Sequence, residues 1–147
     1  YYYLCAIIDL FSRKVIAYKL SNRIDTQLAI DTVYLAVASR EKSNGIIFHS
    51  DRGCQFTSSK FRKHLDNLNM IQSFSAKGHP YDNAVIECFF KYLKKEEVNR
   101  RSYSSFDDLN LSLFQYINGF YNSFRPHSHN NGLSPNDFEQ CYFLNFC

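Results

Sequence analysis

Apolar residues gather at the start of the chain in two runs rich in β-formers, residues 2–10 and 14–20. The turn-like segment Leu10-Phe-Ser-Arg13 joins them, and this pattern predicts an antiparallel hairpin. A later apolar run with β-branched residues, from Gly45 to Asp51, predicts a buried strand. A further short strand is expected over Ile71–Phe74.

Helical periodicity occupies the segments between and after these runs. Asp25 is expected to cap a helix through about Ser39, and Ser58 or Ser59 a helix to about Asn69. The apolar positions expected for the first helix are Leu28, Ile30, Val33, Leu35 and Val37. Strands thus alternate with helices through the middle of the chain, which predicts an α/β fold.

Two more helices are expected in the second half of the chain. Asp82 or Asn83 would cap a helix that carries Glu87, after a stretch rich in turn formers, residues 75–82. A last long helix is expected over about Phe106–Phe124. We interpret its regularly spaced apolar residues as packing residues: Phe106, Leu109, Leu113, Ile117, Phe120 and Phe124.

Composition favours one globular domain. The 147 residues are 45% hydrophobic and 17% aromatic, which argues against disorder. The formal charge of +3 permits an anionic partner without demonstrating one.

Five scattered cysteines form no CxxC pair, which favours free thiols in a reducing compartment. With no signal-peptide pattern and no apolar stretch near the roughly 20 residues of a membrane span, a cytoplasmic protein is the default.

Asp51 and Glu87 are the acids that could carry chemistry. Asp51 stands where an expected strand meets a glycine-containing loop, a common place for an active-site acid in α/β folds. A turn-initiating Asp is an equally good interpretation of that position. Thirty-five residues lie between the two acids, but among 14 acids chance should supply about one such pair. The spacing alone is therefore weak evidence.

Glu87 shares one face of its expected helix with Lys91 and Lys94, opposite an apolar face of Ile86, Phe89, Phe90 and Leu93. A solvated charged face with an intrahelical ion pair explains this stripe. A catalytic acid beside phosphate-binding lysines explains it as well. The loop that leads into the helix ends in backbone N–H groups that favour anions. Nothing organises the histidines into a zinc motif, so we assign them no metal.

Taken together, the motifs resemble one family, the bacterial insertion-sequence transposases of the retroviral-integrase-like (DDE) superfamily. The resemblance covers nearly all 147 residues in the right order. The residues that carry it are Leu10-Phe-Ser-Arg13, His49-Ser-Asp51-Arg-Gly53-Cys-Gln55, Lys77-Gly78, Tyr81-Asp-Asn83-Ala84, Glu87, Phe89-Phe90, Leu93-Lys94, Glu96, Tyr121-Asn122, Arg125, His127 and Ser134-Pro135.

The resemblance implies a ribonuclease-H-like α/β fold with a mixed sheet, flanking helices and a C-terminal helical extension over about 102–147. It implies that Asp51 and Glu87 are catalytic and bind two Mg²⁺ or Mn²⁺ ions as part of an Asp, Asp, Glu triad. Asn83, Lys91 and Lys94 match DNA-binding positions. The implied partners are transposon ends, target DNA and further copies of the chain, with no membrane, in the bacterial cytoplasm at the nucleoid.

The first acid of the implied triad is not Asp9. Asp9 matches the family's second strand, in a turn where a structural role with Ser12 or Arg13 is expected. The family's first catalytic Asp lies on the preceding, central strand, so we expect residues 1–147 to be an N-terminally truncated catalytic core that is inactive in isolation. Two alternatives remain: a ribonuclease-H-like or resolvase-like nuclease that hydrolyses without strand transfer, and a catalytically dead DNA-binding remnant.

Overall fold

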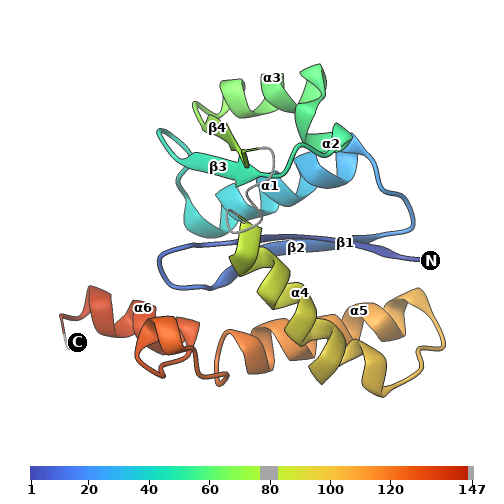
Figure 1. The fold of residues 1–147 in the computed structure, drawn as a ribbon, viewed down its shortest axis with the longest axis vertical. Helices are drawn as coiled ribbons and strands as arrows, with labels where there is room; N and C mark the ends of the chain where they lie inside the picture. The colour runs from blue at the N-terminus through green and yellow to red at the C-terminus, as the bar shows by residue number, and fades with distance from the viewer. Residues whose placement is uncertain (77–82, 146–147) are drawn as a thin grey trace. The chain divides into compact units, whose positions relative to one another are not determined.

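The structure is a computed structural model that describes residues 1–76 and 83–145. The chain forms two compact units (Figure 1). Unit 1 comprises Tyr1–Ile7 and Ile16–Ala84, and unit 2 comprises Ile8–Val15 and Val85–Cys147. Most of the turn-rich stretch expected at 75–82, and the possible cap Asp82, lie outside the described residues.

Strands β1 (Tyr3–Ile8) and β2 (Val15–Ser21) pair with each other, as the two opening apolar runs predict. Their connection is too short for a parallel crossover, so the pair is an antiparallel hairpin. The amide of Asp9 donates to the carbonyl of Lys14 at 2.9 Å, and the amide of Arg13 donates to the carbonyl of Asp9 at 2.8 Å. The predicted hairpin is confirmed.

Unit 1 continues with helix α1 (Thr26–Arg40), which begins as predicted. The Asp25 side chain accepts a hydrogen bond from the amide of Leu28 at 2.8 Å and so satisfies a free N–H of the first turn. Leu28 and Val33 are buried, and Ile30 and Val37 pack against the core. Leu35 is exposed, so the prediction that it belongs to the apolar face is wrong.

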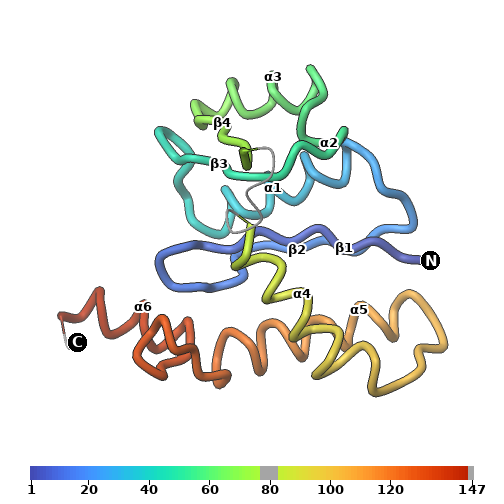
Figure 2. Tube along the Cα trace, viewed as in Figure 1, coloured from blue at the N-terminus to red at the C-terminus, as the bar shows by residue number. Residues whose placement is uncertain are grey.

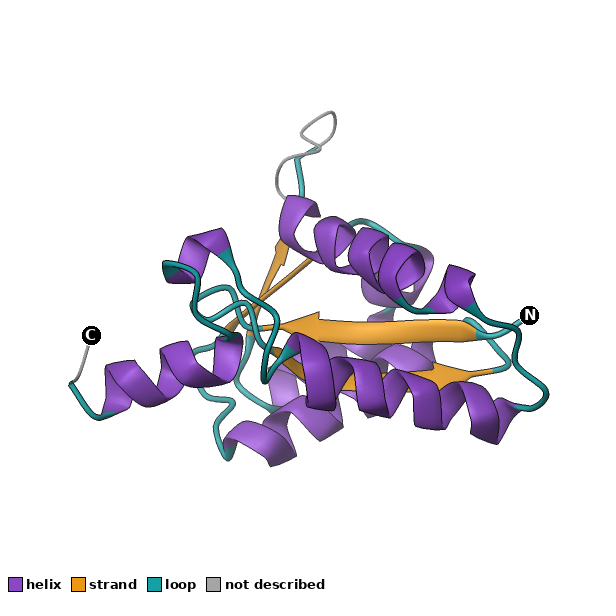
Figure 3. Ribbon diagram, turned by 90° about the horizontal axis from the view of Figure 1, so that it is seen from below, coloured by secondary structure: helices purple, strands orange, loops and turns teal. Residues whose placement is uncertain are grey.

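Two further helices and a strand pair complete unit 1. Helices α2 (Cys54–Thr57) and α3 (Ser59–Asn67) follow strand β3 (Ile47–Ser50), and Ser58 caps α3 by accepting from the amide of Phe61 at 3.2 Å. Strand β4 (Ile71–Phe74) pairs with β3 in parallel, with His49 opposite Ser73. The strands form two separate pairs, β1–β2 and β3–β4 (Figure 3).

The core of unit 1 lies between α1 and α3 (Figure 2). Its buried members are Ala29, Val33, Phe61 and Leu65, and Phe48 and Phe56 pack their rings against Phe61. The expectation that β3 is a buried strand is wrong at its start, because Ile47 is 64% exposed. Only Ser50, at the end of β3, is buried.

Unit 2 contains most of helix α4 (Ala84–Glu96), whose first residue belongs to unit 1. Its remaining elements are η2 (Val98–Arg100), α5 (Phe106–Phe114), the π-helix η3 (Gln115–Tyr121), η4 (Ser128–Asn130) and α6 (Pro135–Phe143). None of the helices in the described ranges is both long and apolar enough to cross a membrane.

The helix expected over 106–124 changes its hydrogen-bond register after Phe114. Bonds from residue i+5 to residue i replace the α-helical pattern, as between the amide of Asn122 and the carbonyl of Ile117 at 2.9 Å. This wider turn places Tyr116 and Tyr121, five residues apart, together in the core. Phe120 and Phe124 are exposed, so the prediction that both are packing residues is wrong, whereas Leu113 and Ile117 are buried as predicted.

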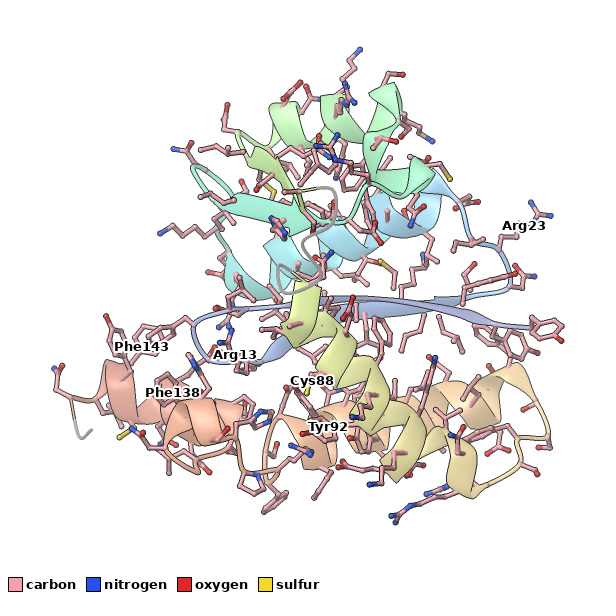
Figure 4. The ribbon with its side chains drawn as sticks, viewed as in Figure 1. Arg13, Arg23, Cys88, Tyr92, Phe138 and Phe143 are labelled. Carbon is pink, nitrogen blue, oxygen red and sulfur yellow. The ribbon has the colours of Figure 1, made fainter. Side chains whose placement is uncertain are left out.

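Polar side chains of the C-terminal segment hold the hairpin turn within unit 2. Asn122 bonds both the amide and the carbonyl of Val15 at 3.0 Å, and Asn130 donates to the carbonyl of Ser12 at 2.7 Å. The hydroxyl of Ser12 donates to Glu139 on α6 at 2.7 Å. Arg13 and Phe138 mark the turn and α6 in Figure 4. Four side chains of this network are buried: Ser12, Asn122, Asn130 and Glu139.

The thiols divide into two groups. Cys5, Cys54 and Cys88 are free, as expected. Cys141 is disulfide-bonded, so the expectation of free thiols is wrong at this position. Burial raises the pKa of the Cys5 thiol, which keeps it protonated and unreactive.

Candidate active site

Asp51 directly follows strand β3 and is exposed. One of its carboxylate oxygens, Oδ1, accepts a hydrogen bond from the amide of Gly53 at 2.8 Å. A Cβ at position 53 would lie 3.0 Å from that oxygen and closer still to the Gln55 side chain, so only glycine fits here without a shift of these groups. The turn-forming role and an exposed acid thus coexist at this residue.

A polar network lies next to Asp51 in unit 1. The His49 ring contacts the Ser73 hydroxyl through Nδ1 at 3.0 Å and the Ser75 hydroxyl through Nε2 at 3.1 Å. Asn83 donates from its side-chain amide to the Ser75 hydroxyl at 2.7 Å. His49 thus lies in β3 with both ring nitrogens engaged.

Glu87 lies in the first turn of α4 and is exposed, as are Lys91 and Lys94. Phe89 and Leu93 are buried, which confirms the predicted division of this helix into an apolar and a charged face. An acid in the first turn interacts favourably with the helix dipole. The exposed Glu87 carboxylate therefore stabilises the start of α4.

The candidate residues are divided between the units. Asp51 and Asn83 belong to unit 1, and Glu87, Lys91 and Lys94 belong to unit 2. Asp9, also in unit 2, uses Oδ1 to accept from the amide of Phe11 at 2.8 Å, the geometry of a turn-forming Asp. Within residues 1–76 and 83–145, no three His, Cys, Asp or Glu side chains are grouped to hold a metal ion.

A second charged cluster lies in unit 2, where two residues of the family motif, Glu96 and Arg125, form a pair that the sequence did not predict. Arg125 binds Glu96 through Nη2 at 2.9 Å and through Nε, and its guanidinium stacks on the Tyr92 ring at 3.7 Å from the centroid (Figure 4 labels Tyr92). The Tyr116 hydroxyl donates to Glu96 at 2.6 Å. Burial opposes ionisation of Glu96, but the hydrogen bonds from Arg125 and Tyr116 outweigh it and lower the pKa of the carboxyl. Glu96 is thus a structural anion.

The sequence matches two models of the integrase core domain, one over residues 1–80 and the other over residues 87–143. The first of these covers more than half of the chain. The chain belongs to the integrase core domain family. The expected resemblance to the integrase-like superfamily is thereby confirmed.

Among the curated relatives of this integrase core are two insertion-sequence transposases. That of IS904 from Lactococcus lactis is 38% identical over 94% of this chain and 54% of its own length. InsF of IS3A from Escherichia coli is 41% identical over 93% of this chain and 48% of its own length. The chain therefore spans about half the length of these relatives.

A third relative carries a different name. A Lactococcus lactis protein named as an ATP-dependent protease is 55% identical over 94 residues, which are 64% of this chain and 30% of that protein. The transposase matches extend over nearly the whole chain and agree with the family models. We therefore interpret the stretch shared with this third relative as integrase core sequence.

Solved structures agree on the fold. The simian T-cell lymphotropic virus intasome in complex with the PP2A regulatory subunit B56 gamma contains a chain that matches 93% of this one with a TM-score of 0.72 at 18% identity, over 48% of its own length. The magnesium complex of the HTLV-2 integrase catalytic core domain matches 93% of this chain and 84% of its own, with a TM-score of 0.64 at 15% identity. The integrase core described here thus has the ribonuclease-H-like fold expected from its sequence.

Proposed function

We propose that this integrase core is the catalytic core of a transposase that cuts DNA at transposon ends and joins them to target DNA. The observation that carries the proposal is the match to two transposases over at least 93% of the chain. Asp51 and Glu87 support the proposal, because both carboxylates are exposed. Asp51 directly follows strand β3, and Glu87 lies in the first turn of α4. The ribonuclease-H-like nuclease and the dead remnant are less favoured, since both named transposases align across both units.

The residues fit the divalent metal that this chemistry uses. Carboxylate oxygens are the ligands that Mg²⁺ and Mn²⁺ prefer, and Asp51 and Glu87 would hold the ions. The exposure of Asp51 supports this role, because its carboxylate is accessible from solvent. A two-ion site needs a third carboxylate, and we propose that it is not Asp9, whose Oδ1 bonds the turn.

The bound ions would supply an activated water or 3′-hydroxyl and would stabilise the leaving oxygen at the scissile phosphodiester. The residues of the chain orient these reactants. The Gly53 amide fixes the rotamer of the Asp51 carboxylate through one oxygen. Lys91 and Lys94, exposed one and two turns after Glu87, would bind backbone phosphates, and Asn83 would contact the DNA end.

A joining assay tests the proposed reaction. The protein as its gene encodes it would be incubated with Mg²⁺ or Mn²⁺ and a duplex that carries the ends of its element. We expect metal-dependent nicks at those ends and longer products in which the ends are joined to a second duplex. Hydrolysis without joined products would favour the nuclease instead, and DNA binding without any cleavage would favour the remnant.

The lysines are tested by DNA affinity. The double variant Lys91→Gln/Lys94→Gln should weaken binding to any sequence and reduce the salt dependence of log K by about 1–2 units of slope, because each phosphate contact releases close to one counterion. Lys60→Gln/Lys63→Gln, which also removes two positive charges from exposed positions of one helix, α3, is the matched control. Equal losses in the control and the double variant would contradict a specific role for the α4 lysines.

A further inference from the structure

We propose that His49 and Ser75 are positioning residues that hold the start of helix α4, and with it Glu87, for the metal-dependent reaction. The inference rests on the proposed function for its catalytic consequence. Its structural basis is a chain of hydrogen bonds among described residues of unit 1, which runs from strand β3 through Ser75 to Asn83.

The first link fixes the His49 ring. His49 lies two residues before Asp51 on β3 and opposite Ser73 on β4. Its Nδ1 is 3.0 Å from the Ser73 hydroxyl and its Nε2 is 3.1 Å from the Ser75 hydroxyl. A partly buried ring with both nitrogens engaged has one orientation, so strand β3 contacts Ser75, the residue after β4, through this side chain.

The second link is Ser75, where the hydrogen bonds converge. Its amide donates to the carbonyl of Ser50 at 3.0 Å, which continues the β3–β4 pairing by one residue. Its hydroxyl lies 3.1 Å from His49 Nε2, 2.7 Å from the Asn83 amide and 3.4 Å from the Ser50 carbonyl. A hydroxyl has one hydrogen to donate and two lone pairs. All three are used if the hydrogen points to Ser50 while Asn83 and His49 donate.

The third link is Asn83, the residue immediately before α4. The bond from its amide to Ser75 ties the beginning of the helix to the end of strand β4. Glu87 follows four residues later, in the first turn of the same helix. Strand β3 is thus linked to Asn83, the residue before α4, through the side chains of His49 and Ser75.

This arrangement brings two polar side chains and one backbone carbonyl to a single hydroxyl group. Catalysis by positioned groups is sensitive to displacements near 1 Å, which can lower a rate about 100-fold. Removal of the Ser75 hydroxyl takes a partner from the Asn83 amide and from His49 Nε2, while His49 Nδ1 keeps its contact with Ser73. We expect the helix start to fray, while the core of unit 1, made by Ala29, Val33, Phe61 and Leu65, stays packed.

The experiment compares Ser75→Ala with Ser75→Thr, which retains a hydroxyl, in the protein as its gene encodes it. We expect Ser75→Ala to lower the rate of DNA joining about 10- to 100-fold with DNA affinity and thermal midpoint close to wild type. Backbone amides of residues 84–88 should exchange with deuterium faster, whereas those of α1 and α3 should not change. Ser75→Thr should restore both properties, and His49→Gln should resemble Ser75→Ala.

The matched control is Ser105→Gly, which removes the hydroxyl that caps α5 in unit 2 at the start of another helix. Wild-type exchange over 84–88 in both Ser75→Ala and His49→Gln would overturn the inference, as would a Ser75→Thr variant no better than Ser75→Ala. Asp51→Asn is measured in parallel. Joining that survives Asp51→Asn would refute the proposed function, and the exchange data would still decide whether Ser75 holds the helix.

Discussion

Replacement of Asp51 by Asn should reduce DNA cleavage and joining by a factor on the order of 10³ or more, with the fold unchanged. Asn has the shape of Asp and can still accept the hydrogen bond from the Gly53 amide, so the turn after β3 should persist. What it loses is the negative charge that a divalent cation requires from its ligand. Glu87→Gln should have a similar effect for the same reason.

The measurement combines joining rates with metal binding. Mn²⁺ titrations followed by electron paramagnetic resonance should show weaker binding in both variants, whether or not DNA is present. Asp66→Asn, an exposed acid on α3, serves as the control for loss of one negative charge. If Asp51→Asn keeps more than about a tenth of the wild-type rate, Asp51 is not a metal ligand in this reaction.

Replacement of Asn122 by Ala should destabilise the protein by about 2–4 kcal/mol. The Asn122 side chain is buried and makes two hydrogen bonds of 3.0 Å to the backbone of Val15, which is itself buried. An alanine would leave a buried N–H and a buried carbonyl without these partners, and each such group costs about 1–3 kcal/mol. The loss of stability should be close to about 4 kcal/mol if no water enters the gap.

Urea denaturation followed by circular dichroism measures this loss. Asn110→Ala is the matched control, because Asn110 is exposed in α5 and alanine is the better helix former. We expect the control to be neutral or slightly stabilising. Equal stabilities of Asn122→Ala and wild type would mean that the hairpin turn is held by the other contacts, those of Asn130 and Glu139.

The sequence predicted those elements of the fold that depend on interactions between residues close together in the chain. The side chains of Asp25 and Ser58 cap their helices by accepting hydrogen bonds from amides three residues later. Asp and Ser are residue types preferred at this position. The apolar and charged faces of α4 follow from residue spacing alone. Asp51 and Glu87 were found through a strand end, a helix face and the family motif, and their catalytic roles stay predictions.

What the sequence could not predict depends on partners far along the chain. The change to π-helical bonds after Phe114 places Tyr116 and Tyr121 in the core, and periodicity written for 3.6 residues per turn cannot anticipate it. Glu96 and Arg125 are 29 residues apart, and only the fold brings them together. The importance of Ser75 was equally hidden, because a serine in a turn-rich stretch gives no sign that three side chains meet there.

The division of the hairpin between the units has a practical consequence for work on this protein. The chain passes from one unit to the other at residues 7–8, 15–16 and 84–85, so neither unit is encoded by a continuous stretch of the gene. A gene fragment for residues 85–147 would lack the octapeptide 8–15 and leave the binding groups of Asn122, Asn130 and Glu139 without their partners. Residues 8–15, supplied as a synthetic peptide, would restore these hydrogen-bond partners to such a fragment.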